Sequence, residues 1–248
     1  MRIIKAGERH YEDFGWLRTN WLFSFADYYD PMNIQFGALR VFNDDTVMPG
    51  MGFPTHPHRE MEIVTIVLTG EITHADSMGN KATIKAGDVQ RMSAGTGLTH
   101  SEFNLGREPA HFYQIWILPD RAGLRPGYDQ REFNSGARSN RLLPVASGQD
   151  FPGAVTIHTD ATIYLSNIDA GRIITFNTEP SRRIFVYVTS GEVGANEANL
   201  SKGDQARIDP DSPAIRLRAY RDAGLVLIDV PSCRGWGYDK KTLQGSKF

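Results

Sequence analysis

Two short stretches of this 248-residue chain hold pairs of side chains that bind transition metals. The first pair is His56 and His58, and the second is His100 and Glu102. Successive side chains of a β-strand alternate between its two faces, so the members of each pair, two residues apart, would point to the same side. Three imidazole nitrogens and one carboxylate oxygen could then meet at one ion. The sequence therefore predicts a metal site built from these four residues.

Pro57 separates the two histidines of the first pair. A proline fixes its own φ angle and pushes the preceding residue toward an extended backbone, so we expect the His56–His58 pair to be partly preorganised. A His-x-His pair alone is commonly an accidental surface feature. The second pair is what favours a metal site.

The segments around these pairs have the composition of short antiparallel strands. Residues 62–68 are rich in β-branched side chains and end at Thr69-Gly70, while residues 82–84 and 89–92 flank a turn at residues 86–88. Short strands separated by turn signals about every ten residues are typical of a barrel or sandwich. A small barrel can gather side chains from different strands at one interior point, so we expect the two pairs to meet there.

The same region resembles the two sequence motifs of the cupin family. The first motif, G(X)5HXH(X)3–4E(X)6G, is matched with one extra residue before its last glycine by Gly50, His56, His58, Glu62 and Gly70. The second motif, G(X)5PXG(X)2H(X)3N, is matched by Gly87, Gly95, His100 and Asn104. Here Ser93 replaces the proline of the motif, and two extra residues lie between Gly95 and His100.

Among the cupins, the chain resembles the pirin-like proteins. The stretches that carry this resemblance are SFADYYDP (24–31), GALRVFNDD (37–45), HPHREMEIVTIVLTG (56–70), SMGN (77–80), MSAGTGLTHSE (92–102) and YQIWI (113–117). The resemblance is close from Asp27 to Arg131. It implies an all-β bicupin, with two antiparallel β-barrel, jelly-roll-like domains in one chain and a metal in the N-terminal barrel. It also implies that the metal ligands are His56, His58, His100 and Glu102.

Glu62 is a second candidate for the carboxylate ligand, because many cupins take theirs from the first motif. Glu62 lies an even number of residues from His58 and could face the same interior. The pirin resemblance favours Glu102, which leaves Glu62 to orient a ligand imidazole through a hydrogen bond. Otherwise Glu62 would be an exposed residue at the start of a strand.

The second half of the chain carries a faint copy of the first. Residues 188–193 and 200–204 parallel residues 67–72 and 84–88, with a glycine at each turn. The copy has no His-x-His pair, and His158 is its only histidine. We therefore predict an N-terminal metal-binding cupin domain over residues 1–138 and a C-terminal degenerate cupin domain without metal ligands over residues 139–248. Residues 121–153 read as a linker, with a short helix around 128–133.

Composition and charge narrow the functional classes. The chain is 40% hydrophobic and 23% charged, with a net charge of −2 and a pI near 6.4, so we expect no nucleic-acid partner. No apolar run approaches the roughly 20 residues of a membrane span, and the first residues turn polar too soon for a signal peptide. A single cysteine, Cys233, is consistent with a reducing compartment. The expected location is cytoplasmic, without a membrane partner.

The expected donor set suits one divalent first-row transition metal, with Fe(II) favoured and Zn, Ni, Cu and Mn also compatible. Four protein ligands leave one or two coordination positions for exogenous ligands. The pirin resemblance implies quercetin 2,3-dioxygenase activity, in which a flavonol, a small aromatic substrate, is cleaved with O2. In this interpretation Glu102 is also the catalytic group that accepts the proton of the flavonol 3-hydroxyl.

Two alternatives stay open. One is a pirin-type regulatory role, in which the redox state of the metal alters the surface and a protein partner binds it. The other keeps a dioxygenase but replaces the flavonol with another enediol or diketone. Fold and ligands do not name a substrate, so the motifs do not decide. The aromatic residues that could line a pocket or fill the core are Phe23, Phe36, Phe53, Phe112, Tyr113 and Trp116.

Overall fold

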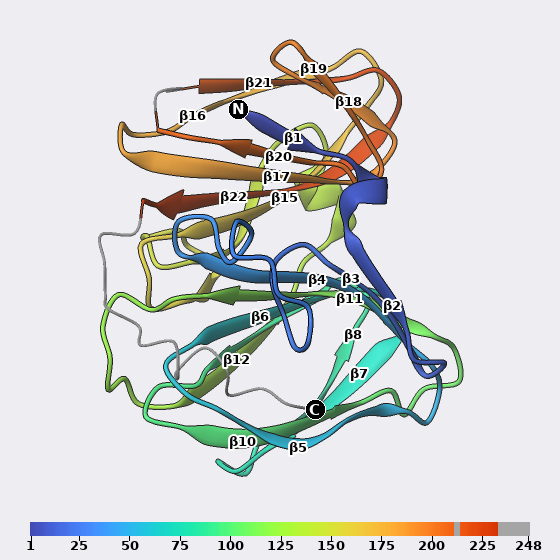
Figure 1. The fold of residues 1–248 in the computed structure, drawn as a ribbon, viewed down its shortest axis with the longest axis vertical. Coiled ribbons are helices and arrows are strands. Elements are labelled where there is room, and N and C mark those ends of the chain that lie inside the picture. Colours follow the sequence, from blue (N-terminus) through green and yellow to red (C-terminus); the bar gives the residue numbers. More distant parts are fainter. Residues whose placement is uncertain (211–213, 233–248) are drawn as a thin grey trace. The chain divides into compact units, whose positions relative to one another are not determined.

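The computed structural model describes residues 1–210 and 214–232, and nearly all of its regular structure is β-strand (Figure 1). The contacts divide the chain into two compact units. The N-terminal unit comprises His10–Glu132 and Val155–Thr159, and the C-terminal unit comprises Met1–Arg9, Phe133–Ala154 and Asp160–Ser232. None of the helices within the described residues is long and apolar enough to cross a membrane. Cys233 lies outside the described residues.

A single cut of the chain does not reproduce this grouping. The first strand, β1 (Arg2–Ile4), pairs antiparallel with β20 (Gln205–Ile208), which places the N-terminus in the C-terminal unit. The ranges 1–138 for a metal-binding cupin domain and 139–248 for a degenerate cupin domain stay a prediction.

The N-terminal unit is a sandwich of two antiparallel sheets. The larger has seven strands in the order β12-β9-β6-β11-β4-β3-β2, and the smaller has four in the order β5-β10-β7-β8. These strands are β2 (His10–Asp13), β3 (Leu17–Trp21), β4 (Leu39–Val47), β5 (Gly52–His58), β6 (Glu62–Thr69), β7 (Glu71–Asp76), β8 (Lys81–Lys85), β9 (Asp88–Ser93), β10 (Leu98–Phe103), β11 (Ala110–Ile117) and β12 (Gly127–Glu132). The short β14 (Val155–Thr156) contacts β9 and β12.

The C-terminal unit repeats this arrangement. Its smaller sheet has the order β16-β21-β18-β19, and its larger sheet contains β1-β20-β17-β22-β15-β13. These strands are β13 (Leu143–Ser147), β15 (Thr162–Ile168), β16 (Ile173–Asn177), β17 (Arg182–Ser190), β18 (Glu192–Ala195), β19 (Ala198–Ser201), β21 (Ala214–Ala219) and β22 (Ala223–Pro231), with 3-10 helices η1 (Ala6–Glu8) and η2 (Ser135–Arg138). The predicted all-β, two-domain architecture is confirmed, but within the described residues the sheets form sandwiches that do not close into barrels.

The turn between β6 and β7 and its counterpart between β17 and β18 explain the glycines of the sequence repeat. Gly70 and Gly191 both have a φ of 71°, in the left-handed region that favours glycine. A Cβ at Gly70 would lie 2.8 Å from the Ala110 Cα, and one at Gly191 would lie 2.1 Å from the Asp222 carbonyl oxygen. Both turns therefore require glycine for conformation and for space.

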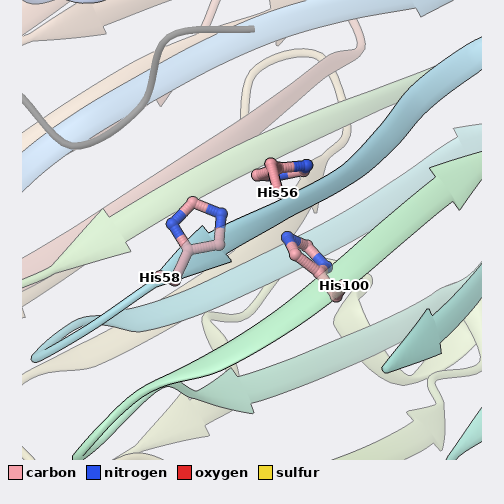
Figure 2. Close-up of side chains that lie close together, drawn as sticks. All are labelled: His56, His58 and His100. Carbon is pink, nitrogen blue, oxygen red and sulfur yellow. The ribbon is translucent and has the colours of Figure 1, made fainter. Parts of the chain in front are cut away.

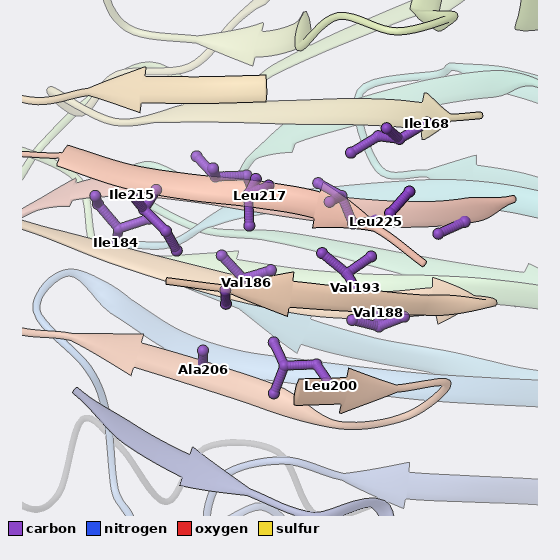
Figure 3. Packing of buried hydrophobic residues seen from close by; sticks show 14 of the residues in the cluster. Ile168, Ile184, Val186, Val188, Val193, Leu200, Ala206, Ile215, Leu217 and Leu225 are labelled. Carbon is purple, nitrogen blue, oxygen red and sulfur yellow. The ribbon is translucent and has the colours of Figure 1, made fainter. Parts of the chain in front are cut away.

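Each unit has its own hydrophobic core between its two sheets. The core of the C-terminal unit is shown in Figure 3 and includes Ile168, Ile184, Val186, Val188, Val193, Leu200, Ile215, Leu217 and Leu225. A cluster in the N-terminal unit consists of Leu17, Val47, Phe53, Val67, Ile72, Ile84, Ala110 and Phe112. Burial of one such large aliphatic or aromatic side chain contributes about 1.5–3 kcal/mol, so these clusters hold the two sheets of each unit together.

The helix predicted around residues 128–133 is wrong. Residues 127–132 form β12, which pairs antiparallel with β9 from Gly127 opposite Ser93 to Glu132 opposite Asp88. The polar side chains of this segment carry little intrinsic preference, and the edge of β9 offers unpaired backbone groups that a strand satisfies. Part of the predicted linker is therefore ordered as strand, in β12 and in β13.

Candidate metal centre

The four predicted residues lie on two adjacent strands. His56 and His58 belong to β5, His100 and Glu102 belong to β10, and the strands pair antiparallel with His100 directly opposite His56. The next pair along the strands is Glu102 opposite Phe53. From one pair to the next, β10 advances by two residues and β5 by three. This bulge on β5 lets Phe53 share the buried face with His58 in spite of their odd spacing.

The three imidazoles converge from these strands. Their ring centroids are 4.5 Å apart for His56 and His100, 4.8 Å for His56 and His58, and 4.9 Å for His58 and His100. Figure 2 shows the rings gathered around a common space, two from β5 and one from β10. A second group, in which one donor atom from each side chain lies within 4.8 Å of the others, consists of His74, His100 and Glu102. The structure thus groups three of the four predicted residues, His56, His58 and His100, and places Glu102 in a second group with His100 and His74.

Burial keeps the imidazoles neutral. It lowers the pKa of His58 to about 3, with a further contribution from the charge of His56. Burial and the neighbouring histidines also lower the pKa of His100, and burial lowers the pKa of His56. Because neutral imidazole is the form that binds a metal, all three histidines are ready for coordination at neutral pH.

Neighbouring groups fix the orientation of the first two rings. His56 Nδ1 lies 2.8 Å from the Pro54 carbonyl oxygen, which can only accept, so Nδ1 carries the proton and donates. The lone pair of the neutral ring then lies on Nε2. The ring of His58 packs edge-on against Trp116, with centroids 4.9 Å apart and an interplanar angle of 83°. These contacts orient the imidazoles before any ion binds.

Glu102 is buried between the sheets, with one oxygen held by a hydrogen bond. Gln114 Nε2, on β11 of the larger sheet, donates to Glu102 Oε2 at 2.8 Å, and Trp116 Nε1 donates to Gln114 Oε1 at 3.2 Å. Burial raises the pKa of Glu102 to about 7, against the opposing effect of the Gln114 hydrogen bond. The carboxylate is therefore poised for use near neutral pH, where a bound cation would favour its ionised form.

Two buried polar atoms test whether this cluster fits a metal. For His100 Nε2 and Glu102 Oε1, no described residue provides a hydrogen-bond partner. Buried polar atoms without partners are costly and rare in folded proteins. A divalent cation would satisfy both, and imidazole nitrogens with a carboxylate oxygen suit a first-row transition metal. The residues therefore fit a metal centre.

His74 is the member of the cluster that the sequence reasoning missed. It lies on β7, opposite Glu102 of β10, and Asp76 of β7 lies opposite His100. The side chains of His74 and Asp76 are fully buried, with His74 Nε2 3.1 Å from Asp76 Oδ2. His74 Nδ1 is 3.4 Å from His100 Nδ1. The spacing of His74 and Asp76, two residues apart at the end of a strand, is a signal that could have found them.

Glu62 takes part in a different cluster. It is fully buried, so the interpretation as an exposed residue is wrong. Its Oε2 accepts hydrogen bonds from the Ser93 hydroxyl at 2.8 Å and from the His158 backbone at 3.2 Å, and its Oε1 lies 3.4 Å from His158 Nδ1. Within the described residues, Glu62 makes no hydrogen bond to His56, His58 or His100. Ser93, which replaces the motif proline, is instead the side chain that holds it.

The aromatic candidates divide between core and site. Phe53 and Phe112 belong to the hydrophobic cluster of the N-terminal unit, as the core interpretation expects. Trp116 contacts His58 and, through Gln114, is linked to Glu102.

The fold and this cluster define a cupin protein with two domains in one chain. Residues 5–117 match the family model described as Pirin, and residues 144–230 match that described as Quercetinase C-terminal cupin domain. A quercetin 2,3-dioxygenase of Escherichia coli is 41% identical, over 92% of this chain and 98% of its own. A pirin-like protein of Caulobacter vibrioides is 44% identical, over 88% of this chain and 94% of its own. This chain belongs to the pirin family.

Solved structures agree with this assignment. The crystal structure of the bacterial pirin YhhW from Escherichia coli in complex with nickel(II) has a TM-score of 0.89 and 40% identity, and the match covers 94% of this chain and 99% of that chain. A quercetin 2,3-dioxygenase from Acinetobacter baumannii has a TM-score of 0.77 with 23% identity, which supports the fold alone.

Proposed function

We propose that this protein is a metal-dependent dioxygenase that cleaves flavonols such as quercetin with O2. The observation that carries the proposal is a pair of donor groups that share His100: the imidazoles of His56 and His58 on one side, and the buried Glu102 carboxylate on the other. Neither His100 Nε2 nor Glu102 Oε1 has a hydrogen-bond partner among the described residues. The similarity to the Escherichia coli protein named quercetin 2,3-dioxygenase supports the same activity class.

The proposed ligands are His56, His58, His100 and Glu102, around one divalent ion. Fe(II) is the leading assignment, and Zn, Ni, Cu and Mn fit the same donor set. When bound, the ion supplies open coordination positions for the flavonol oxygens and for O2. The nickel(II) in the YhhW structure belongs to that protein. The native metal of this protein is to be determined by metal analysis.

The neighbouring side chains have separate tasks in this proposal. Gln114 donates to Glu102 Oε2, which keeps the carboxylate in one orientation and leaves Oε1 available for the ion. Glu102 Oε1 takes the proton of the flavonol 3-hydroxyl as the substrate binds. Both atoms of O2 enter the product, and the carbon between the two broken carbon–carbon bonds leaves as carbon monoxide.

The experiment is aerobic turnover of quercetin, followed by the loss of its near-visible absorbance, on protein whose metal content has been assayed. The variants are His56→Ala and His58→Ala, and the control is His111→Ala, which removes a histidine of the same unit that bonds Asp44 at 2.6 Å outside the cluster. Turnover that tracks bound metal, releases carbon monoxide, disappears in both variants and persists in the control is the expected result.

A fully metallated protein that leaves quercetin unchanged would contradict the proposal. The alternatives would then be a dioxygenase for another enediol or diketone, and a metal-binding regulatory protein that acts through a protein partner. A panel of diketone substrates, assayed by O2 consumption, separates these two.

A further inference from the structure

We propose that His74 and Asp76 are positioning residues of the candidate metal centre, which hold His100 in the tautomer whose unprotonated Nε2 faces the ion. The inference rests on the proposed function in one respect, that His100 is a metal ligand. His74 would accept a hydrogen bond from His100 and donate one to the fixed carboxylate of Asp76. The tautomers of both histidines would then be set before any metal binds.

The chain of contacts begins at the turn between β7 and β8. Asp76 Oδ1 accepts hydrogen bonds from the backbone N–H groups of Met78 at 2.9 Å and Asn80 at 3.0 Å. Its Oδ2 accepts one from the Asn80 side-chain amide at 2.9 Å and lies 3.1 Å from His74 Nε2. The Met78 N–H, the Asn80 N–H and the Asn80 side-chain amide all donate to Asp76 and fix both of its oxygens. The turn therefore holds this carboxylate in place as a hydrogen-bond acceptor.

The positions of the protons follow from this acceptor. A neutral imidazole has one N–H and one lone pair. His74 must place its proton on Nε2 to donate to Asp76, so its Nδ1 carries the lone pair. His74 Nδ1 lies 3.4 Å from His100 Nδ1, and a hydrogen bond there requires one proton between the two nitrogens. His100 Nδ1 must therefore supply it.

The consequence falls on the other nitrogen of His100. With its proton on Nδ1, neutral His100 has its lone pair on Nε2, the buried atom for which no described residue provides a partner. Metal-binding histidines commonly donate their second N–H in this way, and the donated bond sets both tautomer and ring orientation. Here a histidine is interposed between the ligand and the carboxylate.

The surrounding packing restricts His74 to this geometry. Its side chain is fully buried, and its ring lies against Tyr128 of β12, with centroids 4.9 Å apart and an interplanar angle of 36°. The central strand β10 pairs with β5 on one side and with β7 on the other, so His100 lies opposite His56 and Asp76 at once. The ligand strand and the positioning strand are thus neighbours in one sheet.

The first test reads the tautomer directly in the metal-free, full-length protein. With 15N-labelled histidine, NMR distinguishes protonated from unprotonated ring nitrogens. The expected result is a protonated Nδ1 and an unprotonated Nε2 for His100, and the reverse pattern for His74. In His74→Phe, which keeps a ring against Tyr128 but has no ring nitrogen, the His100 signals should shift toward a mixture of tautomers.

The second test is Ni²⁺ affinity, measured by competition with a chelator. His74→Phe should weaken binding about 10- to 100-fold, the range typical of lost outer-shell partners. His74→Asn, whose side-chain oxygen can still accept from His100 Nδ1, should recover much of that loss. The matched control is His111→Phe, which breaks the bond to Asp44 and should leave the affinity unchanged.

Three results would overturn the proposal. One is a His100 proton on Nε2 in the metal-free wild type. Another is a His74→Phe variant with wild-type Ni²⁺ affinity. The third is binding of two equivalents by the wild type and one by His74→Phe, because His74 would then be a ligand itself. Wild-type protein that binds no metal would instead contradict the proposed function, while the NMR pattern would still decide the tautomer. If His74→Phe does not fold, His74→Asn and the wild-type spectrum decide.

Discussion

Gln114 offers a sharp test of how the larger sheet supports the site. Both ends of its buried amide are used, since Nε2 donates to Glu102 Oε2 at 2.8 Å and Oε1 accepts from Trp116 Nε1 at 3.2 Å. Gln114→Leu keeps the approximate volume and removes both hydrogen bonds. In this variant the buried carboxylate of Glu102 loses its hydrogen bond from residue 114. The indole N–H of Trp116 loses its acceptor.

The magnitude can be built from these losses. Leaving a buried polar group without its partner costs about 1–3 kcal/mol, and two groups are affected. The greater apolar burial of leucine offsets part of this, so we expect a net loss of about 3 kcal/mol in the free energy of unfolding of the metal-free protein. A carboxylate that is free to rotate should also weaken Ni²⁺ binding by about tenfold or more.

Gln90 provides the matched control, because it is buried in the same sheet and neither its Nε2 nor its Oε1 has a hydrogen-bond partner among the described residues. Gln90→Leu removes an amide that makes no such bond, so the free energy of unfolding should stay the same or rise. Urea unfolding, followed by tryptophan fluorescence, measures both variants. Equal destabilisation by the two would refute the reasoning, since the hydrogen bonds of Gln114 would then contribute nothing specific.

Three further predictions concern the carboxylates and a turn. Glu102→Gln should keep much of the bound metal and lose quercetin turnover, measured by metal content and absorbance, and retained turnover would exclude the proton-transfer role. Burial raises the pKa of Asp45 to about 8, so the folded state retains a proton that the unfolded state loses near pH 4, and stability falls as pH rises from 4 to 8. The free energy of unfolding of Asp45→Asn should therefore rise relative to that of the metal-free wild type by about 1.4 kcal/mol per pH unit in that window, measured by urea unfolding. A difference between the two proteins that does not change with pH would contradict the raised pKa of Asp45. Gly191→Ala should destabilise the protein by about 2 kcal/mol more than Gly171→Ala in the same assay. Both glycines have a positive φ, so the backbone strain is shared. A Cβ at Gly191 would lie 2.1 Å from the Asp222 carbonyl oxygen, whereas nothing lies within 4 Å of a Cβ at Gly171.

Local periodicity accounts for the part of the site that the sequence could predict. Residues two apart share a face of a strand whatever the partner strand is, so the pairs His56–His58 and His100–Glu102 could be read directly. The run from residue 62 to 68 lies within β6, because its β-branched residues pack well in a buried strand. The two pairs meet at His100, which belongs both to the group with His56 and His58 and to the group with Glu102.

Long-range strand pairing accounts for what the sequence reasoning missed. His74 reaches the site because β7 pairs with β10, and no local pattern states which strands are neighbours. Glu62 has the parity to face the same interior, yet it pairs with Ser93 across β6 and β9 and bonds there. Residues 128–133 lacked a clear alternation, and the available edge of β9 decides their strand conformation. Register is a tertiary property, set by burial on one face.

The smaller sheets of the two units have the same strand arrangement, but their corresponding strands bury different kinds of side chain. In the C-terminal unit, Ile215 and Leu217 of β21, the strand that occupies the place of β10 in the sheet order, are buried in the hydrophobic core (Figure 3). In the N-terminal unit, β10 buries His100 and Glu102, each with an atom that no described residue binds. Each buried apolar side chain contributes about 1.5–3 kcal/mol, whereas each unpartnered polar group costs about 1–3 kcal/mol. The two unpartnered donors of β10 therefore cost the metal-free N-terminal unit part of its stability. Because a ligand stabilises only the state that binds it, metal should raise the stability of the N-terminal unit selectively.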